Sequence, residues 1–238
     1  MFGIRPFATM LVALLTVSSS MHAAVITLTP IMDGTYLTTK TTGNPAVETV
    51  DTTQLFLLSQ RDVIRNAFSS YVSGNENRIG MEFDLSVLSS LGPVTSAVLL
   101  WTELVEVGSP NTHNLRGADG TGSLSFSNWS SSALLGNAND GTIDSPASFD
   151  VTSTVQQFDT NGNQYGRFFI SSGNGNITSA GGGNFRSRVS PYQIASRLSA
   201  TPPQLVITTV PEAGSLVLLG MGSGICLVAR MLRRSARG

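Results

Sequence analysis

The chain has 238 residues, of which 12% are charged, and its formal net charge is −1. Proteins usually carry about 25% charged residues, so this chain is poor in charge. Because its net charge is close to zero, it has no strong electrostatic field that would attract nucleic acid or an acidic polymer. Cys226 is the only cysteine, which excludes internal disulfides and cysteine-based zinc sites. A catalytic or metal-binding histidine would have to be His113, since the other, His22, lies near the amino terminus. We therefore expect a protein that is not an enzyme and has no cofactor, no metal and no nucleic-acid partner.

Residues 1–24 have the organisation of a secretory signal peptide. Arg5 gives a weakly positive start, the stretch 7–17 is mostly apolar, and small residues follow as far as Ala24. The apolar stretch is shorter than the ~18 residues that a membrane-spanning helix needs. We expect signal peptidase to cleave after Ala23 or Ala24. A buried first helix or an uncleaved anchor is the alternative.

The exported domain, residues 25–209, shows short runs of β-branched and apolar residues separated by Gly, Asn, Asp, Ser and Pro. Turns are predicted at Asp-Gly and Asn-Gly pairs, among them Asp33-Gly34, because these residues adopt positive φ angles at little cost. The predicted strands are 25–28, 36–39, 53–58, 67–72, 78–83, 95–107, 123–126, 148–151, 165–172 and 204–209. This number of short strands favours an all-β fold, a two-sheet antiparallel β-sandwich of jelly-roll type.

One short helix is predicted at 153–158, where Thr152 or Asp150 can cap the first turn. Val155 and Phe158 are three residues apart, so both can face the edge of the sandwich. The alternating runs place a further set of residues in the core. The predicted core consists of Phe83, Leu85, Ala97, Leu99, Phe149, Val151, Phe169, Leu205 and Ile207.

Residue pairs that could catalyse a reaction are few. Glu103 and Glu106 form the nearest pair of glutamates, but their odd spacing on a strand puts them on opposite faces. We therefore expect both to be solvated or edge charges and not the paired carboxylates of a glycosidase. His113 lies in a polar stretch and is expected at the surface.

Two sets of residues could bind a ligand. Residues 159–163 supply clustered oxygen atoms that could suit calcium, although a hairpin turn explains them equally well. Trp101, Trp129 and Tyr192 are candidates for stacking on a sugar ring. Trp101 lies in the most apolar strand and is expected in the core, which leaves Trp129 as the better candidate for contact with a glycan.

The carboxy-terminal residues 210–238 form a tail of three parts. Val210, Pro211 and Glu212 come first, and the uncharged, glycine-rich stretch 214–229 follows. The stretch is just long enough for a membrane helix. Basic residues at the end of such a helix hold it with that end in the cytoplasm. These basic residues are Arg230, Arg233, Arg234 and Arg237.

This tail resembles the PEP-CTERM sorting signal of Gram-negative bacteria, in which Val-Pro-Glu-Pro precedes an apolar helix and an arginine cluster. Ala213 stands in place of the second proline. The resemblance implies an exosortase as processing partner, with cleavage near Pro211 and Glu212 and release of the exported domain. An ordinary single-pass anchor is the alternative.

The exported domain is similar to the DNRLRE-type jelly-roll domain, which is related to some carbohydrate-binding modules. The similarity rests on the order of several short motifs, and Val189 stands where that family commonly has Glu. The motif segments are 78–85, 94–101, 149–155, 185–188 and 202–207.

These features predict a non-catalytic exported surface or extracellular-matrix protein. It would be held in the inner membrane by residues 214–229 before processing, and then reside at the cell surface or outside the cell, with exopolysaccharide as a partner. The alternative is a secreted carbohydrate-binding module or a carbohydrate-acting hydrolase.

Overall fold

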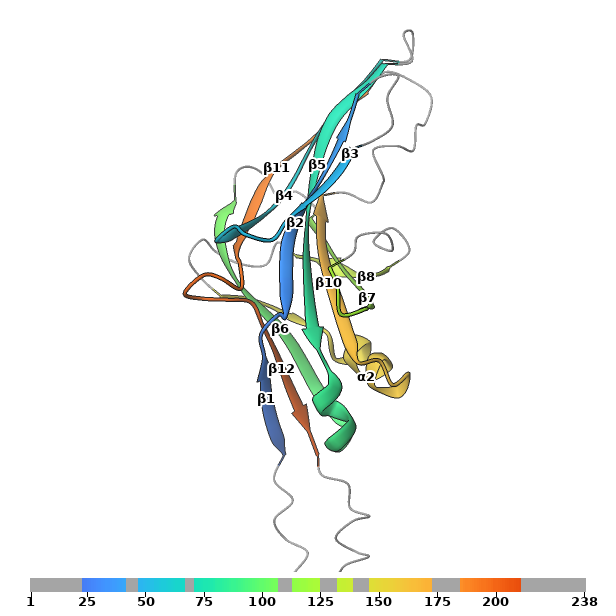
Figure 1. Ribbon diagram of the computed structural model, residues 1–238, viewed down its shortest axis with the longest axis vertical. Coiled ribbons are helices and arrows are strands. Elements are labelled where there is room, and N and C mark those ends of the chain that lie inside the picture. Colours follow the sequence, from blue (N-terminus) through green and yellow to red (C-terminus); the bar gives the residue numbers. More distant parts are fainter. Residues whose placement is uncertain are drawn as a thin grey trace, which may run out of the picture.

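The computed structural model describes residues 23–41, 47–66, 71–106, 113–124, 132–138, 146–172 and 185–210. These residues form an almost entirely β structure with one α helix and one 3-10 helix (Figure 1). The strands are β1 (Ala24–Leu28), β2 (Met32–Lys40), β3 (Val47–Asp51), β4 (Phe56–Asn66), β5 (Tyr71–Asp84), β6 (Val94–Glu106), β7 (His113–Asp119), β8 (Ala133–Asn137), β9 (Pro146–Asp150), β10 (Tyr165–Ser172), β11 (Phe185–Ala195) and β12 (Gln204–Thr209). The helices are η1 (Ser86–Ser90) and α2 (Thr152–Thr160). The predicted all-β class is confirmed.

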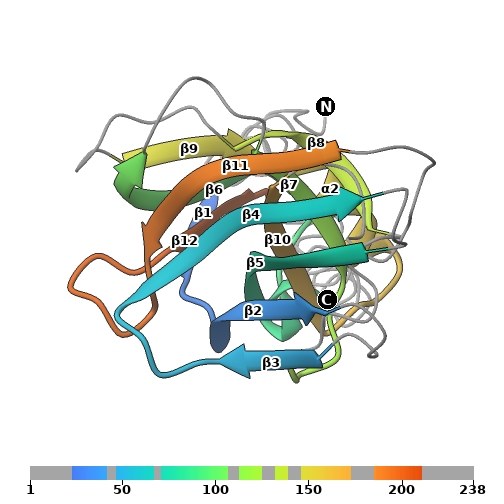
Figure 2. The ribbon, with the colours of Figure 1, turned by 90° about the horizontal axis from the view of Figure 1, so that it is seen from above.

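All the described strand pairs are antiparallel, and hydrogen bonds join the strands in the order β1-β12-β6-β11-β4-β5-β10-β7-β8 (Figure 2). The other strands attach at the side: β2 pairs with β5 and β3, and β9 pairs with β6. The two predicted sheets are therefore joined into one. The joint is β6, whose first part pairs with β12 and β9 and whose last part pairs with β11, across a register shift between Gln193 and Ile194.

The sheet folds back on itself, so that two layers face each other across the main core. β6 and β12 contribute Leu99 and Ile207 from one layer, and β5 and β10 contribute Phe83 and Phe168 from the other. The rings of Phe83 and Phe168 meet edge to face at 6.0 Å, and Phe158 of α2 meets Phe168 at 6.2 Å. A sandwich-like arrangement results, with α2 beside the layers.

Most of the predicted core residues are fully buried in this cluster, and two differ. Phe149 is only partly buried, since β9 is an edge strand that pairs with β6 alone among the described strands. Phe169 is buried but belongs to a second cluster with Tyr36. Consecutive strand residues point to opposite faces, so Phe168 takes the main core and Phe169 the other side of β10. The fully buried predictions are Phe83, Leu85, Ala97, Leu99, Val151, Leu205 and Ile207.

Several local predictions were wrong. The Asp33-Gly34 turn lies inside β2, where Asp33 is buried and accepts a 2.5 Å hydrogen bond from the backbone N–H of Arg197. Ser123 and Leu124 are not in a strand, and the rest of the predicted strand 123–126 lies outside the described residues. Residues 67–70 also lie outside them. The unpredicted strands are β3, β7, β8 and β11.

The predicted helix is confirmed as α2, which begins one residue earlier and ends two residues later than expected. The Asp150 carboxylate accepts a 2.8 Å hydrogen bond from the backbone N–H of Thr152, so Asp150 satisfies a donor of the first turn. Val155 and Phe158 are both buried, as their spacing predicts. The helix is tied to β6, because Gln156 Nε2 donates to the carbonyl of Val94 at 2.8 Å.

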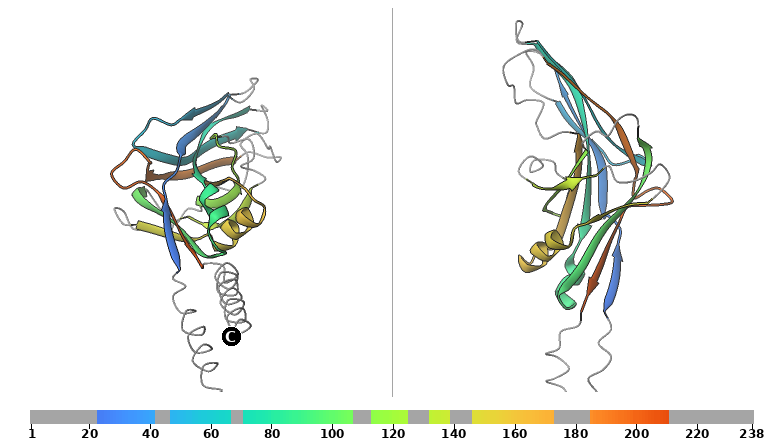
Figure 3. Two further views of the ribbon diagram at one scale, coloured as in Figure 1. Left: turned by 60° about the horizontal axis from the view of Figure 1, so that its bottom comes forward. Right: turned by 180° about the vertical axis from the view of Figure 1, so that it is seen from behind.

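The first and last strands of the fold lie side by side, in register from Ala24 opposite Thr209 to Leu28 opposite Leu205 (Figures 1 and 3). Thr209 is also paired with Val94, the first residue of β6. We call the end of the fold defined by Ala24, Val94 and Thr209 the terminal pole. The chain enters and leaves the described domain there.

Replacing Leu99 with Ala should lower the free energy of unfolding by about 2–5 kcal/mol, because a fully buried side chain is removed from a core that spans both layers. Leu100→Ala is the matched control, since the neighbouring Leu100 lies on the opposite face and is only partly buried. Urea denaturation gives the free energy of unfolding of both variants. Equal losses for the two variants would show that Leu99 does not occupy the core described.

Candidate functional site

Of the residues predicted for the sorting signal, the membrane stop and the glycan contact at Trp129, only Val210 lies within the described part of the chain. It is 39% exposed, and its backbone N–H donates to the carbonyl of Pro93 at 3.2 Å. The signal peptide before Ala23 and the segment 214–229 lie outside the described residues. So do Trp129, Pro211, Glu212, Arg230, Arg233, Arg234 and Arg237.

His113 is not at the surface, and that prediction was wrong. It is the first residue of β7 and only 2% exposed, because β7 pairs with β10 and carries the ring into the interior. Its Nδ1 lies 3.0 Å from the hydroxyl of Ser59, and its ring stacks on Tyr192 with centroids 4.9 Å apart. The distance would suit a nucleophile and its base, but both residues are buried. Their burial favours a structural role.

Tyr192 and Trp101 belong to the same buried polar network. Trp101 Nε1 donates to the hydroxyl of Tyr192 at 2.7 Å, and this hydroxyl donates to the carbonyl of Ala138 at 3.0 Å. The expectation that Trp101 lies in the core is confirmed. Tyr192 is equally buried, so it cannot stack on a sugar at the surface. Both polar groups have partners, as buried indole and phenol groups require.

Glu103 was expected as a solvated or edge charge and is instead fully buried. It lies where β6 changes neighbours, directly opposite Ile194 of β11. The sequence around it gave no sign that a second strand covers this part of β6. Glu106 pairs through its backbone with Tyr192.

Two buried ion pairs lie on the side of β5 and β10 that carries Phe169. Arg78 contacts Glu76 at 2.5 Å, and Arg167 contacts Glu82 at 2.7 Å, with all four side chains 0–1% exposed. Glu82 also accepts the backbone N–H groups of Thr121 and Gly122. The second pair therefore holds residues after β7 against the sheet. Sequence reasoning missed these residues, although the i, i+2 spacing of Glu76 and Arg78 would place them on one face.

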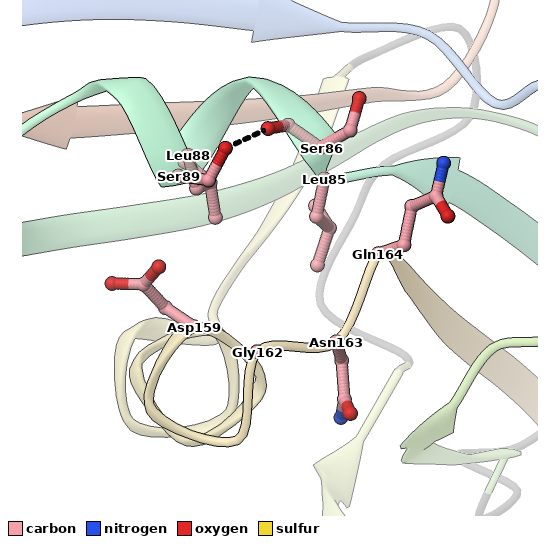
Figure 4. Close-up of a pocket in the computed structure, with 8 residues that line it drawn as sticks. All are labelled: Leu85, Ser86, Leu88, Ser89, Asp159, Gly162, Asn163 and Gln164. Atoms are coloured by element: carbon pink, nitrogen blue, oxygen red, sulfur yellow. Dashed lines mark hydrogen bonds between the residues drawn. The ribbon is translucent and has the colours of Figure 1, made fainter.

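The residues considered for calcium, 159–163, form the end of α2 and the turn after it. Asp159, Gly162 and Asn163 border a small cavity of about 250 Å³ (Figure 4). Leu85 and Leu88 contribute apolar side chains, and the polar lining residues are Ser86, Ser89, Asp159, Asn163 and Gln164. Gly162 has a φ of +68°, and its N–H donates to the carbonyl of Asp159 at 2.9 Å. This geometry is that of a turn that ends the helix. Asn163 is engaged elsewhere, since its Nδ2 donates to Asp119 at 2.7 Å.

A second hollow, of about 600 Å³ and more open, lies between β9 and α2. Its lining includes Leu135, Phe149 and Gln156. Two of its polar groups already serve the fold, because Asp150 accepts from Thr152 and Gln156 donates to Val94.

Within the described ranges, no three His, Cys, Asp or Glu side chains gather as a metal site would require. No helix of the described residues has the length and hydropathy needed to cross a membrane. The protein-family models with which the sequence was compared give no match, and neither do the curated proteins.

The buried carboxyl of Asp33 gives a testable pH dependence. Burial raises its pKa, and this effect outweighs the hydrogen bond and the positive charge of Arg197, which lower it. The folded state therefore binds the proton more tightly than the unfolded state, so the contribution of Asp33 to stability is present at low pH and is lost as the pH rises through the folded-state pKa. Asp33→Asn should remove this loss in urea denaturation measured between about pH 3 and pH 7.

Asp150→Asn is the control, because the contribution of Asp150 to stability should change with pH in the opposite direction. The hydroxyl and backbone N–H of Thr152 lower the pKa of Asp150, so its contribution is present at neutral pH and is lost on acidification. If Asp33→Asn and the unmodified chain lost stability in parallel as the pH rises, Asp33 would not be a buried acid of raised pKa.

Proposed function

We propose that the chain is a non-catalytic exported protein of the cell surface or extracellular matrix. A signal peptide directs it across the inner membrane, the tail 210–238 holds it there, and an exosortase cleaves near Pro211 and Glu212. The observation that carries the proposal is that both ends of the described domain meet at the terminal pole, where Ala24 pairs with Thr209.

β12 ends at Thr209, directly before Val210, the first residue of the sorting motif. Val210 makes the last backbone hydrogen bond described, to Pro93, and Pro211 follows it. Proline has no N–H, so it cannot continue the ladder of β12. Cleavage after this point would remove none of the strand pairs described. Ala24 is the first residue of β1, so signal peptidase cleavage after Ala23 would leave β1 whole, and cleavage after Ala24 would remove its first residue.

The strands that reach the terminal pole carry little charge, which suits a position beside a membrane. Residues 23–32, 85–102 and 198–210 include β1, η1, β12 and most of β6, and they contain no Asp, Glu, Lys or Arg. From Val210, four residues reach Gly214, the start of the apolar stretch, and they span at most about 14 Å. The uncharged strands add no cost of taking ions out of water at the bilayer surface, although Asp84 and Asp159 lie beside η1.

We further propose that the domain is a jelly roll of the DNRLRE type. The segments that carry the resemblance fall on β5, β6, β9 with the start of α2, β11 and β12. Phe83 and Leu85 of the first segment, Ala97 and Leu99 of the second and Leu205 and Ile207 of the last all point into the main core. Their shared packing role supports the resemblance and favours a scaffold.

The carbohydrate-binding alternative rests on fewer residues than the sequence suggested. Trp101 and Tyr192 are buried and bonded to each other. Of the three aromatic candidates, Trp129 is the one that a polysaccharide array with a Trp129→Ala control would test.

Mass spectrometry of the exported protein tests the proposed processing. In cells that possess an exosortase, the carboxy terminus should lie near Pro211, and Pro211→Ala should retain residues as far as the arginine cluster and stay in the membrane fraction. Pro202→Ala is the matched control, because Pro202 precedes β12 and lies outside the motif; it should be processed normally. Recovery of the unmodified chain with its terminus intact in such cells would leave a plain membrane anchor.

A further inference from the structure

We propose that the outer edge of β1 pairs with β1 of a second copy of this chain, forming a two-fold antiparallel strand pair between released molecules. The proposal rests on the proposed function in one respect, the release of the domain from the membrane. It concerns a surface that the sorting signal does not involve.

β1 is an open edge of the described sheet. Among the described strands it pairs with β12 alone, and it ends the strand order. Val25 is 63% exposed on the outer face. On the inner face, Ile26 and Leu28 pack against the main core but remain only partly buried. An added strand would complete the burial of these two side chains, which supplies a hydrophobic driving force.

The other edge strands of the described sheet carry features that hinder pairing, and β1 carries none. β3 has Glu48 and Asp51. β8 has a bulge at Leu135, where the register with β7 shifts, and β9 begins with Pro146 and ends with Asp150. Charges, bulges and prolines are the usual means by which sheet edges avoid association. The sequence of β1, Ala-Val-Ile-Thr-Leu, has no charge and no proline, and its register with β12 is unbroken.

The sequence of β1 is compatible with pairing to itself. In an antiparallel pair centred on Ile26, Ala24 lies opposite the Leu28 of the second copy, and Val25 lies opposite its Thr27. Directly opposed residues point to the same face, so both copies keep their apolar residues on the core side. This register also pairs all five residues of the strand.

Because of the direction of β1, this pairing requires that the domain is first released from the membrane. β1 starts at the terminal pole, so an antiparallel pair would put the two poles at opposite ends. Two chains anchored in one membrane have their poles on the same side and cannot form this pair. Membrane attachment therefore keeps the edge unpaired, and cleavage of the tail permits association.

Sedimentation of the released protein over a range of concentrations tests the proposal. We expect a monomer–dimer equilibrium, and Thr27→Lys should raise the dimer dissociation constant by about tenfold or more, since it places a charge in the strand pair of each copy. Gln204→Lys is the matched control: Gln204 lies on the same outer face but in β12, away from the edge. It should leave the constant unchanged. Thermal unfolding verifies that both variants fold, and Val25→Lys serves as a second edge variant.

A protein that stays monomeric at all concentrations would overturn the proposal, as would equal weakening by Thr27→Lys and Gln204→Lys. Release and pairing are separate readouts, since mass spectrometry reports the first and sedimentation the second. If the tail is not cleaved, the full chain in detergent still tests the edge, because its copies are no longer aligned by a shared membrane.

Discussion

The backbone pairing between β1 and β12 determines where both ends of the described domain lie. Five residue pairs bring the first strand against the last, and β12 in turn pairs with the start of β6. The ladder leaves β1 as an edge strand and ends beside Val94, where Val210 makes its hydrogen bond to Pro93. The proposed routes into and out of the membrane, and the proposed self-pairing, depend on this arrangement.

Charge is distributed unevenly around that ladder. β1, β12 and residues 94–102 of β6 are uncharged, whereas ion pairs lie within the fold on β5 and β10 and between β2 and Arg197. Removing one member of a buried pair leaves an uncompensated charge, which is costly, although the intact pair adds little net stability. Two of the pairs join different segments, Arg167 of β10 to Glu82 of β5 and Arg197 to Asp33 of β2, whereas Arg78 and Glu76 lie on one strand. Glu82, for example, holds both Arg167 and the chain at Thr121.

The sequence predicted strands that are rich in β-branched and apolar residues and are bounded by turn residues. β12 is the clearest case, with its predicted bounds confirmed and Leu205 and Ile207 buried. It did not predict β7, because His113 lies in a polar stretch and was expected at the surface, whereas β10 in fact lies beside it. Glu103 is similar, since its burial depends on β11, a strand far away in the sequence. Such contacts between distant segments are not recorded in local periodicity.

A disulfide across the first and last strands tests the closure of the fold most directly. Val25 and Thr208 lie directly opposite each other, so cysteines there would have Cα atoms within the range that a disulfide spans. In a Cys226→Ser background, the Val25→Cys, Thr208→Cys variant should oxidise within one chain, at a mass lower by two hydrogens. Val25→Cys with Gln204→Cys should not, because Gln204 lies at the far end of β12. Failure of the first pair to close, or equal closure of both, would contradict the pairing on which the account depends.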